Sequence, residues 1–184
     1  MDVTPTPLEG VLILRPERFT DARGFFSESY NKQRLLQIGI ETEFVQDNIA
    51  YNKSCLTLRG LHFQKAPFTQ AKLVSVLKGA ALDVVVDLRS SSQSLGRHFA
   101  VELSAEEGAQ LFVPTGFAHG FMTLEPDTLF SYKVSNYYSA EHDSGIRFDD
   151  PLLAIDWGVE PHSILTSGKD RKLPPFDPRA EYFA

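Results

Sequence analysis

The stretch Thr57 to Gln64, TLRGLHFQ, carries a histidine and an arginine among hydrophobic residues. If the strand alternates regularly, His62 lies on the same face as Leu58 and Gly60, and Arg59 points the other way unless Gly60 kinks the strand. A histidine in such a strand is either a core side chain satisfied by one hydrogen bond or part of a functional site. The neighbouring glycine indicates a bulge or a close approach by another group.

A lysine and a tyrosine occupy later strands in positions where they could also do chemistry. Lys72 opens a strand and shares a face with Val74. It is either a solvated edge residue or a cation that holds a ketone oxygen as it becomes an enolate. Tyr132 faces the same way as Phe130. It either packs with a tethered hydroxyl or donates a proton within an apolar pocket.

Two further residues depend on how the chain folds. His119 alternates with Phe117 and Phe121, as in an aromatic core stripe. The 5 histidines are scattered and no His-x-His pair occurs, so we expect no metal site. Asp170 lies in the polar segment SGKDRK. If that tail folds over the preceding strands, its carboxylate could orient an imidazole and raise its basicity.

The elements that must position these residues are mostly strands. Residues 31–40 predict a helix, with Asn31 as N-cap and Gly39 near its end. Strands are predicted within residues 10–16, 24–30, 43–51, 55–64, 72–89, 97–104, 110–117, 118–125 and 128–138. This short regular spacing favours an all-β protein, an antiparallel barrel or jelly roll, as one domain over residues 1–184. The mouth of such a barrel is a usual ligand site.

Composition excludes several classes of protein. The chain of 184 residues has a formal net charge of −6, which argues against a nucleic-acid surface. The N-terminus has no signal-peptide pattern, and no apolar run is long enough to span a bilayer, so we expect a cytoplasmic protein with no membrane partner. The single cysteine, Cys55, allows no internal disulfide and is expected to be a small core residue.

Six stretches, in this order, resemble the dTDP-4-dehydrorhamnose 3,5-epimerases of the cupin superfamily: RGLHFQ, DVVVDLR, VPTGFAHGF, YKVSNYY, HDSGIRFDDP and SGKDRKLP. The resemblance runs from about Val11 to Pro175. It implies a cupin jelly-roll barrel with short flanking helices, a homodimer, and neither a metal nor another cofactor. The implied substrate is a dTDP-4-keto-6-deoxysugar, dTDP-4-dehydro-6-deoxy-D-glucose, and the implied product is dTDP-4-dehydro-β-L-rhamnose.

The resemblance also implies roles for individual residues. His62 resembles the family's general base, with Asp170 as its carboxylate partner. Tyr132 resembles the proton donor on the opposite face of the sugar, and Lys72 the group that steadies the enolate. The positions that contact the sugar nucleotide would be Arg23, Glu28, Gln46, Asn48, Arg59, Lys72, His119, Tyr138, Asp143 and Lys169. Arginine suits a diphosphate through its charge and paired donors, and the segment DARGFFSESY would reach the partner subunit.

Departures from the family pattern keep other hypotheses open. Asp143 stands where the family usually has glutamate, and Ser75 and Ala81 also differ from the usual residues. A second hypothesis is therefore a monofunctional epimerase, acting at C3 or at C5 of a related dTDP-4-keto sugar. A third is a non-catalytic cupin that only binds a nucleotide sugar, because a fold alone decides no function. Inward-facing His62, Lys72 and Tyr132 would be superfluous to a pure binder.

Overall fold

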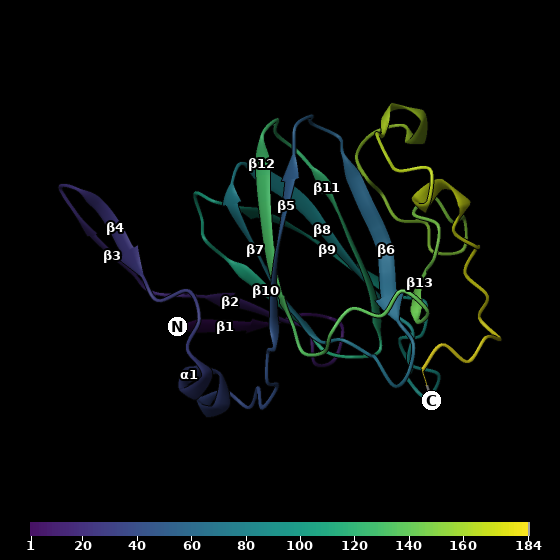
Figure 1. Cartoon of the computed structure of the whole chain (residues 1–184), viewed down its shortest axis with the longest axis horizontal. Helices are drawn as coiled ribbons and strands as arrows, with labels where there is room; N and C mark the ends of the chain where they lie inside the picture. The colour runs from purple at the N-terminus through teal and green to yellow at the C-terminus, as the bar shows by residue number, and fades with distance from the viewer. Residues whose placement is uncertain (184) are drawn as a thin grey trace.

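The computed structural model describes residues 1–183 as two β-sheets that face each other, with a hairpin projecting to one side (Figure 1). One sheet has the strand order β1-β2-β10-β7-β12-β5 and the other β13-β6-β11-β8-β9. The bounds are β1 Asp2–Pro5, β2 Leu12–Arg15, β3 Arg18–Asp21, β4 Gly24–Ser27, α1 Lys32–Gln37, β5 Gln46–Asn52, β6 Leu58–Gln64, β7 Lys72–Lys78, β8 Ala80–Asp87, β9 His98–Ser104, β10 Gln110–Val113, β11 Phe117–Thr123, β12 Thr128–Val134, β13 Asp143–Gly145, and the 3₁₀ turns η1 Pro161–Ser163 and η2 Asp170–Lys172. The predicted all-β jelly-roll barrel is confirmed.

Antiparallel register decides which side chains of the six-stranded sheet face the interior. On β12, Phe130 and Tyr132 lie opposite Val76 and Val74 of β7, and residues directly opposite share a face. Phe130, Val74 and Val76 belong to the cluster of buried apolar residues between the sheets, and Tyr132 packs against it. The alternation predicted for Lys72, Tyr132 and their neighbours is therefore confirmed.

A second core lies on the outer side of the five-stranded sheet. There the segment after β13 covers the sheet and contributes Ile146, Phe148, Trp157, Ile164 and Phe176 to one buried cluster. Figure 1 shows this C-terminal segment running along β6 and β13. The tail thus folds back over the barrel, which is the arrangement that gives Asp170 a place beside β6.

Asp150 ties the end of this segment to the body of the molecule. Its carboxylate accepts hydrogen bonds from the backbone N–H of Leu152 at 2.8 Å and of Phe176 at 2.9 Å. Asp150 is almost fully buried, so these bonds satisfy a charge that is otherwise costly inside a protein. These hydrogen bonds hold together the two ends of the segment that carries Asp170.

Other local predictions have mixed outcomes. The helix forms as α1, and the Asn31 side chain caps it by accepting a hydrogen bond from Arg34 N–H at 3.1 Å. Cys55 is not a core residue: it is exposed, in a turn before β6. Residues 1–183 contain no helix that is both long and apolar enough to cross a membrane.

Candidate active site

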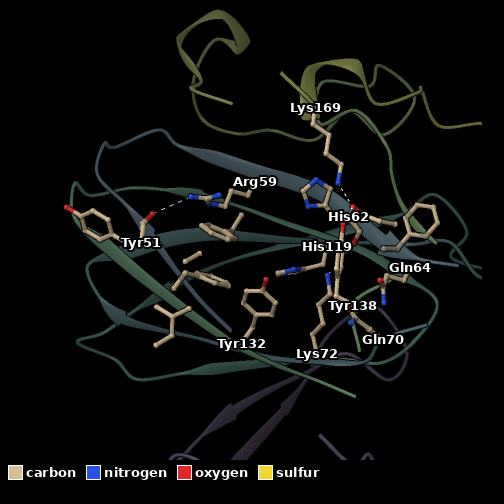
Figure 2. A pocket seen from close by; sticks show the side chains of 16 residues that line it. Tyr51, Arg59, His62, Gln64, Gln70, Lys72, His119, Tyr132, Tyr138 and Lys169 are labelled. Carbon is tan, nitrogen blue, oxygen red and sulfur yellow. Dashed lines mark hydrogen bonds and ion pairs between the residues drawn. The ribbon is translucent and has the colours of Figure 1, made fainter. Parts of the chain in front are cut away.

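A cavity of about 490 Å³ opens between the two sheets, and Figure 2 shows the side chains around it. Its lining consists of aromatic and polar side chains from both sheets. The lining residues are Ile49, Ala50, Tyr51, Arg59, His62, Phe63, Gln64, Gln70, Lys72, His119, Phe121, Phe130, Tyr132, Tyr138, Asp143 and Lys169. A cavity of this size, with a few convergent polar groups, fits a small-molecule site.

A bulge in β6 brings Arg59 and His62 into the same cavity. On the partner strand β11, His119 lies opposite His62 and Phe121 lies opposite Arg59, so β6 has one more residue than β11 over this stretch. The extra residue reverses the alternation, which places Leu58 in the outer core and both polar side chains inside. The arrangement predicted for a regular strand, with His62 on the face of Leu58 and opposite Arg59, therefore does not occur, and the alternative of an irregularity at Gly60 is confirmed.

His62 forms a hydrogen-bonded pair with Asp170. Its Nε2 lies 2.8 Å from Asp170 Oδ1, and the other carboxylate oxygen accepts the N–H of Gly60 at 3.3 Å. Burial alone would raise the pKa of Asp170, but these hydrogen bonds hold that pKa below its ordinary value. The carboxylate is therefore ionised, Nε2–H donates to it, and Nδ1 is the nitrogen of His62 that can take a proton.

Lys72 enters the cavity from the opposite sheet and is 8 % exposed. Its Nζ donates a hydrogen bond to the backbone carbonyl of His62 at 3.4 Å. Burial lowers the pKa of Lys72 from 10.5 to about 8, against the attraction of Asp83 and Asp143. At neutral pH the side chain is still mostly an ammonium ion, held in surroundings where its charge acts strongly on a bound oxyanion.

Tyr132 lies on β12, in the sheet opposite the one that carries His62. Burial raises the pKa of its phenol, and the positive charge of Arg59 offsets part of that effect. The phenol is therefore protonated at neutral pH and can donate a proton. A flat ligand between the sheets would meet an imidazole on one side and a phenol on the other.

His119 forms a second histidine–carboxylate pair in the lining of the cavity. Its Nε2 donates to Asp83, with the two carboxylate oxygens at 2.9 and 3.1 Å. His119 is 6 % exposed and Asp83 is 0 % exposed. Burial lowers the pKa of His119 and the Lys72 charge lowers it further, although Asp83 opposes both, so the imidazole is neutral at pH 7.

Three residues from separate segments meet at the mouth. Tyr138 Oη donates to Asp143 Oδ2 at 3.0 Å, and Lys169 Nζ makes an ion pair with the same oxygen. Tyr138 is exposed. This hydrogen bond raises the pKa of Tyr138, and the ion pair raises the pKa of Lys169. The mouth therefore offers an aromatic face and a cation to a ligand.

The chain is similar to known proteins along almost its whole length. The family model described as dTDP-4-dehydrorhamnose 3,5-epimerase matches residues 5–178. The chain belongs to the dTDP-4-dehydrorhamnose 3,5-epimerase family. A relative of that name from Sinorhizobium fredii is 48% identical over 164 residues, covering 89% of this chain and 84% of its own.

Similar solved structures include epimerases with bound ligands. One, a dTDP-4-dehydrorhamnose 3,5-epimerase from Bacillus anthracis with TDP and PPi bound, is 49% identical, has a TM-score of 0.92 and covers 95% of this chain and 99% of its own. Another, a dTDP-6-deoxy-D-glucose-3,5-epimerase from Legionella pneumophila in complex with dTDP-4-keto-L-rhamnose, is 38% identical, with a TM-score of 0.88 and coverage of 96% and 98%. As a member of this epimerase family, the chain is an isomerase that acts on a carbohydrate.

Most residues expected to act in an epimerase of this family lie around the cavity. Asp170 stands behind His62 and completes the pair. Those that line the cavity itself are His62, Lys72, Tyr132, Arg59, His119, Tyr138, Asp143 and Lys169. Gln46 and Asn48 lie on β5, where Asn48 is opposite Tyr132 on β12, and Gln46 Nε2 donates to Asn48 Oδ1 at 2.8 Å. Their register puts them on the interior face beside the phenol.

Arg23 and Glu28 do not reach the cavity of their own chain. Arg23 is at the turn of the β3–β4 hairpin, its side chain 90% exposed and paired with Asp21 at 2.6 Å. Glu28 follows β4, where it accepts a hydrogen bond from Asn31 at 2.9 Å and lies 3.0 Å from Arg34. Figure 1 shows the hairpin pointing away from the two sheets.

The epimerase site contains residues that the sequence analysis did not select. Asp83 was not a candidate, although an aspartate within the apolar run ALDVVVD is a recognisable signal of a buried polar role. Gln64 and Gln70 also line the cavity, and Gln64 Oε1 accepts the N–H of Ser139 in the loop that carries Tyr138. Among Asp143, Ser75 and Ala81, which differ from the usual residues of the family, only Asp143 lines the cavity. Ser75 lies between the interior Val74 and Val76 on β7, so its side chain points to the other face of the sheet.

Proposed function

We propose that the protein catalyses epimerisation at C3 and C5 of dTDP-4-dehydro-6-deoxy-D-glucose, giving dTDP-4-dehydro-β-L-rhamnose. The observation that carries the proposal is that His62, paired with Asp170 of the η2 turn, lies on one sheet and the Tyr132 phenol on the other, both facing one cavity. We further propose that the whole chain, residues 1–184, forms one catalytic domain, because both sheets contribute to a single interior core.

The chemistry needs a base, an acid and a cation. The hydrogens on C3 and C5 are acidic because the resulting carbanion is delocalised onto the C4 ketone oxygen. Nδ1 of His62 takes the proton and the C–H electron pair becomes the enolate, while Asp170 stabilises the imidazolium that forms. Tyr132 then returns a proton to the same carbon from the opposite face, which inverts the centre. Only protons move, and nothing is oxidised overall.

Lys72 is the group that we assign to the enolate oxygen. Its ammonium is buried in the cavity, where an unpaired charge is costly and a developing oxyanion would stabilise it. A lysine with a pKa near 8 can also donate a hydrogen bond strongly at neutral pH. Arg59 and the mouth residues Tyr138 and Lys169 are left to hold the nucleoside diphosphate.

We propose that the active form is a homodimer in which a second copy supplies Arg23 to the cavity. Support comes from the hairpin, which carries Arg23 away from its own barrel and exposes three phenylalanines, Phe19, Phe25 and Phe26, at 52%, 57% and 68%. Exposed aromatic residues on a projecting hairpin are typical of a surface that is buried in an assembly.

The test is incubation with dTDP-4-dehydro-6-deoxy-D-glucose in deuterated water, followed by NMR. Label at both C3 and C5 of an L-configured product is expected, and His62→Ala should lower exchange at both carbons by at least 10³-fold, on the order of a lost general base. Label at one carbon alone identifies a monofunctional epimerase. Tight dTDP binding without exchange identifies a non-catalytic binder, and substantial exchange by His62→Ala overturns the assignment of the base.

A further inference from the structure

Asp83 is a carboxylate in the middle of β8 with no access to solvent. Its neighbours along the strand are apolar, and residues Ala81, Val84, Val85 and Val86 are fully buried. A carboxylate in such a strand lowers stability unless it is paired, because it loses its hydration. The structure pairs it with His119, through hydrogen bonds of 2.9 and 3.1 Å to Nε2.

This pairing fixes which nitrogen of His119 carries the proton. Because both Asp83 oxygens lie at Nε2, the neutral ring keeps its hydrogen there and has a lone pair at Nδ1. His119 lines the cavity, so its remaining nitrogen is suited to accept a hydrogen bond from a hydroxyl group of a bound sugar. Without the carboxylate, either tautomer could form and this preference would be lost.

Asp83 also supplies negative charge near Lys72. The other titratable side chains that line the cavity with Lys72 are Tyr51 on β5, Arg59 and His62 on β6, His119 on β11, Tyr132 on β12, Asp143 on β13, and Tyr138 and Lys169 at the mouth. Asp83 on β8 does not line the cavity but acts on Lys72 from behind His119. Of these groups, only Asp83 and Asp143 are carboxyl groups. Asp143 is already paired with Lys169 and Tyr138 at the mouth, whereas Asp83 is buried with a neutral partner. Its attraction is the larger of the two that act on Lys72.

We propose that Asp83 is a positioning residue of this active site: it holds His119 as the Nε2–H tautomer and keeps the buried Lys72 cationic when the enolate forms. The proposal rests on the function proposed above, in which Lys72 meets the enolate oxygen. Asp83 itself touches no substrate, because His119 stands between it and the cavity. The same reaction therefore depends on two histidine–carboxylate pairs, of which His62–Asp170 moves protons and His119–Asp83 does not.

The kinetic test is Asp83→Asn, which keeps the shape of the side chain and removes its charge. We expect kcat to fall by about fivefold or more at pH 8, and the alkaline limb of the kcat profile to move about one pH unit or more toward lower pH. The KM for substrate should change less than kcat, because the nucleotide contacts at the mouth are intact. An alkaline limb at the same pH as in the wild type overturns the role assigned to Asp83 on Lys72.

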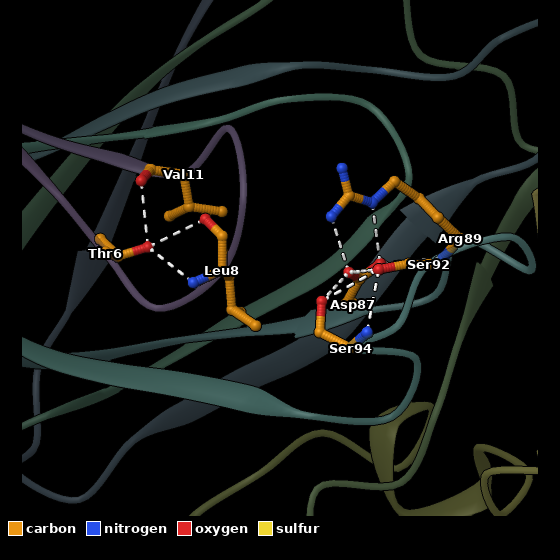
Figure 3. A network of polar contacts seen from close by, with 7 residues as sticks. All are labelled: Thr6, Leu8, Val11, Asp87, Arg89, Ser92 and Ser94. Carbon is orange, nitrogen blue, oxygen red and sulfur yellow. Dashed lines mark hydrogen bonds and ion pairs between the residues drawn. The ribbon is translucent and has the colours of Figure 1, made fainter.

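Asp87→Asn is the matched control. Asp87 lies four positions further along the same strand and is equally buried, but Figure 3 shows it bonded to Arg89, Ser92 and Ser94, away from the cavity. This variant should lose stability and keep the wild-type pH profile of kcat. If both variants shift the profile equally, the effect belongs to β8 in general and the proposal fails.

A measurement independent of activity covers the case in which Asp83→Asn does not fold. In wild-type protein labelled with ¹⁵N-histidine, His119 should show the neutral Nε2–H tautomer at pH 7. An Nδ1–H tautomer or a charged ring contradicts the proposal, whether or not the protein is an epimerase. Conversely, a wild-type enzyme without exchange at C3 and C5, together with the expected tautomer, contradicts the proposed function and leaves the Asp83–His119 geometry standing.

Discussion

Lys72 is the residue at which the demands of catalysis and of folding conflict most clearly. Its ammonium is buried, and its one hydrogen bond within the described residues 1–183 is a long one, 3.4 Å, to a backbone carbonyl. Burial lowers its pKa to about 8, so the folded protein binds this proton less tightly than the unfolded chain does. Between about pH 8 and 10.5 the unfolded chain holds more protons, and stability therefore rises with pH over that window.

Lys72→Met should accordingly be more stable than the wild type while losing activity. We expect the free energy of unfolding at pH 7 to rise by about 1–3 kcal/mol, because an apolar side chain of similar length replaces a buried charge. The gain should shrink as pH rises through 8 to 10, where the wild-type lysine becomes neutral. Denaturant unfolding at pH 7 and pH 10 measures both values.

Lys78→Met is the control for that experiment, since Lys78 ends the same strand and is exposed. Its free energy of unfolding should stay within about 0.5 kcal/mol of the wild type at both pH values. If Lys72→Met is instead less stable than the wild type at pH 7, the buried ammonium is stabilised by interactions stronger than the ones described here.

Residue types and alternation predicted much of the site at this scale. Lys72, Tyr132 and His119 face inward as their strand patterns predict, because β7 and β12 pair in register over residues 72–76 and 130–134 and β11 pairs in register with β8. Asp83 was missed because a polar residue inside an apolar run has no spacing that names its partner. That partner, His119, lies 36 positions further along the chain and meets it only across a strand pair.

The bulge in β6 is the element that assembles the site. Gly60 has a φ of +136°, a conformation that other residues rarely adopt, and a Cβ there would lie 2.5 Å from the Cα of Gly120 on β11. The two backbones approach so closely because neither residue has a side chain. This approach lets β6 present Arg59 and His62 to one cavity, and lets Gly60 N–H bond to Asp170.

Gly60→Ala should therefore damage both stability and activity. The free energy of unfolding should fall by about 2 kcal/mol or more, because the new methyl group is strained in φ and collides with backbone. The kcat should fall by about 10²-fold, as expected when a catalytic base shifts by about 1 Å. Denaturant unfolding and the deuterium-exchange assay provide the two readouts.

Gly168→Ala serves as the comparison for stability, since its backbone is outside the left-handed region and no other atom lies within 4 Å of the new methyl group. It should unfold within about 0.5 kcal/mol of the wild type. A Gly60→Ala protein with wild-type stability and activity would show that the strand pair can separate without cost.

Element prediction succeeded where a pattern was regular and failed at this bulge. The strands β2 and β4 to β12 and the α1 helix could be read from period and capping residues. The strands β1, β3 and β13 were not predicted, because each has only three or four residues and no clear apolar alternation. An extra residue in β6 leaves the local pattern of apolar and polar residues almost unchanged, so only the glycine indicated a kink. The sequence did not predict where the C-terminal tail packs. That position depends on buried contacts such as the hydrogen bond between Asp150 and Phe176, which lie far along the chain from the barrel strands.

At the scale of the whole molecule, the position of Arg23 is the feature that a single chain does not explain. The resemblance assigns it to the sugar nucleotide, yet the hairpin holds it away from the cavity of its own barrel. The resemblance implies that its segment reaches the partner subunit, but the residues by themselves do not show which subunit Arg23 serves, since both arrangements have the same residues in the same order. A homodimer with exchanged hairpins reconciles the two observations.

Complementation between two defective chains distinguishes the arrangements. Arg23→Ala and His62→Ala chains, each with a different affinity tag, are coexpressed and the heterodimer is purified by both tags. In this heterodimer, the barrel with an intact His62 receives Arg23 from the other chain, so about half of the wild-type activity should return.

The matched control is a heterodimer of the wild type with a chain that carries both substitutions. It has the same two changes, but its only intact His62 faces a hairpin without Arg23, so it should be nearly inactive. If Arg23 served its own barrel, the outcomes would be reversed: the double-mutant heterodimer would have half of the activity and the complementing pair almost none.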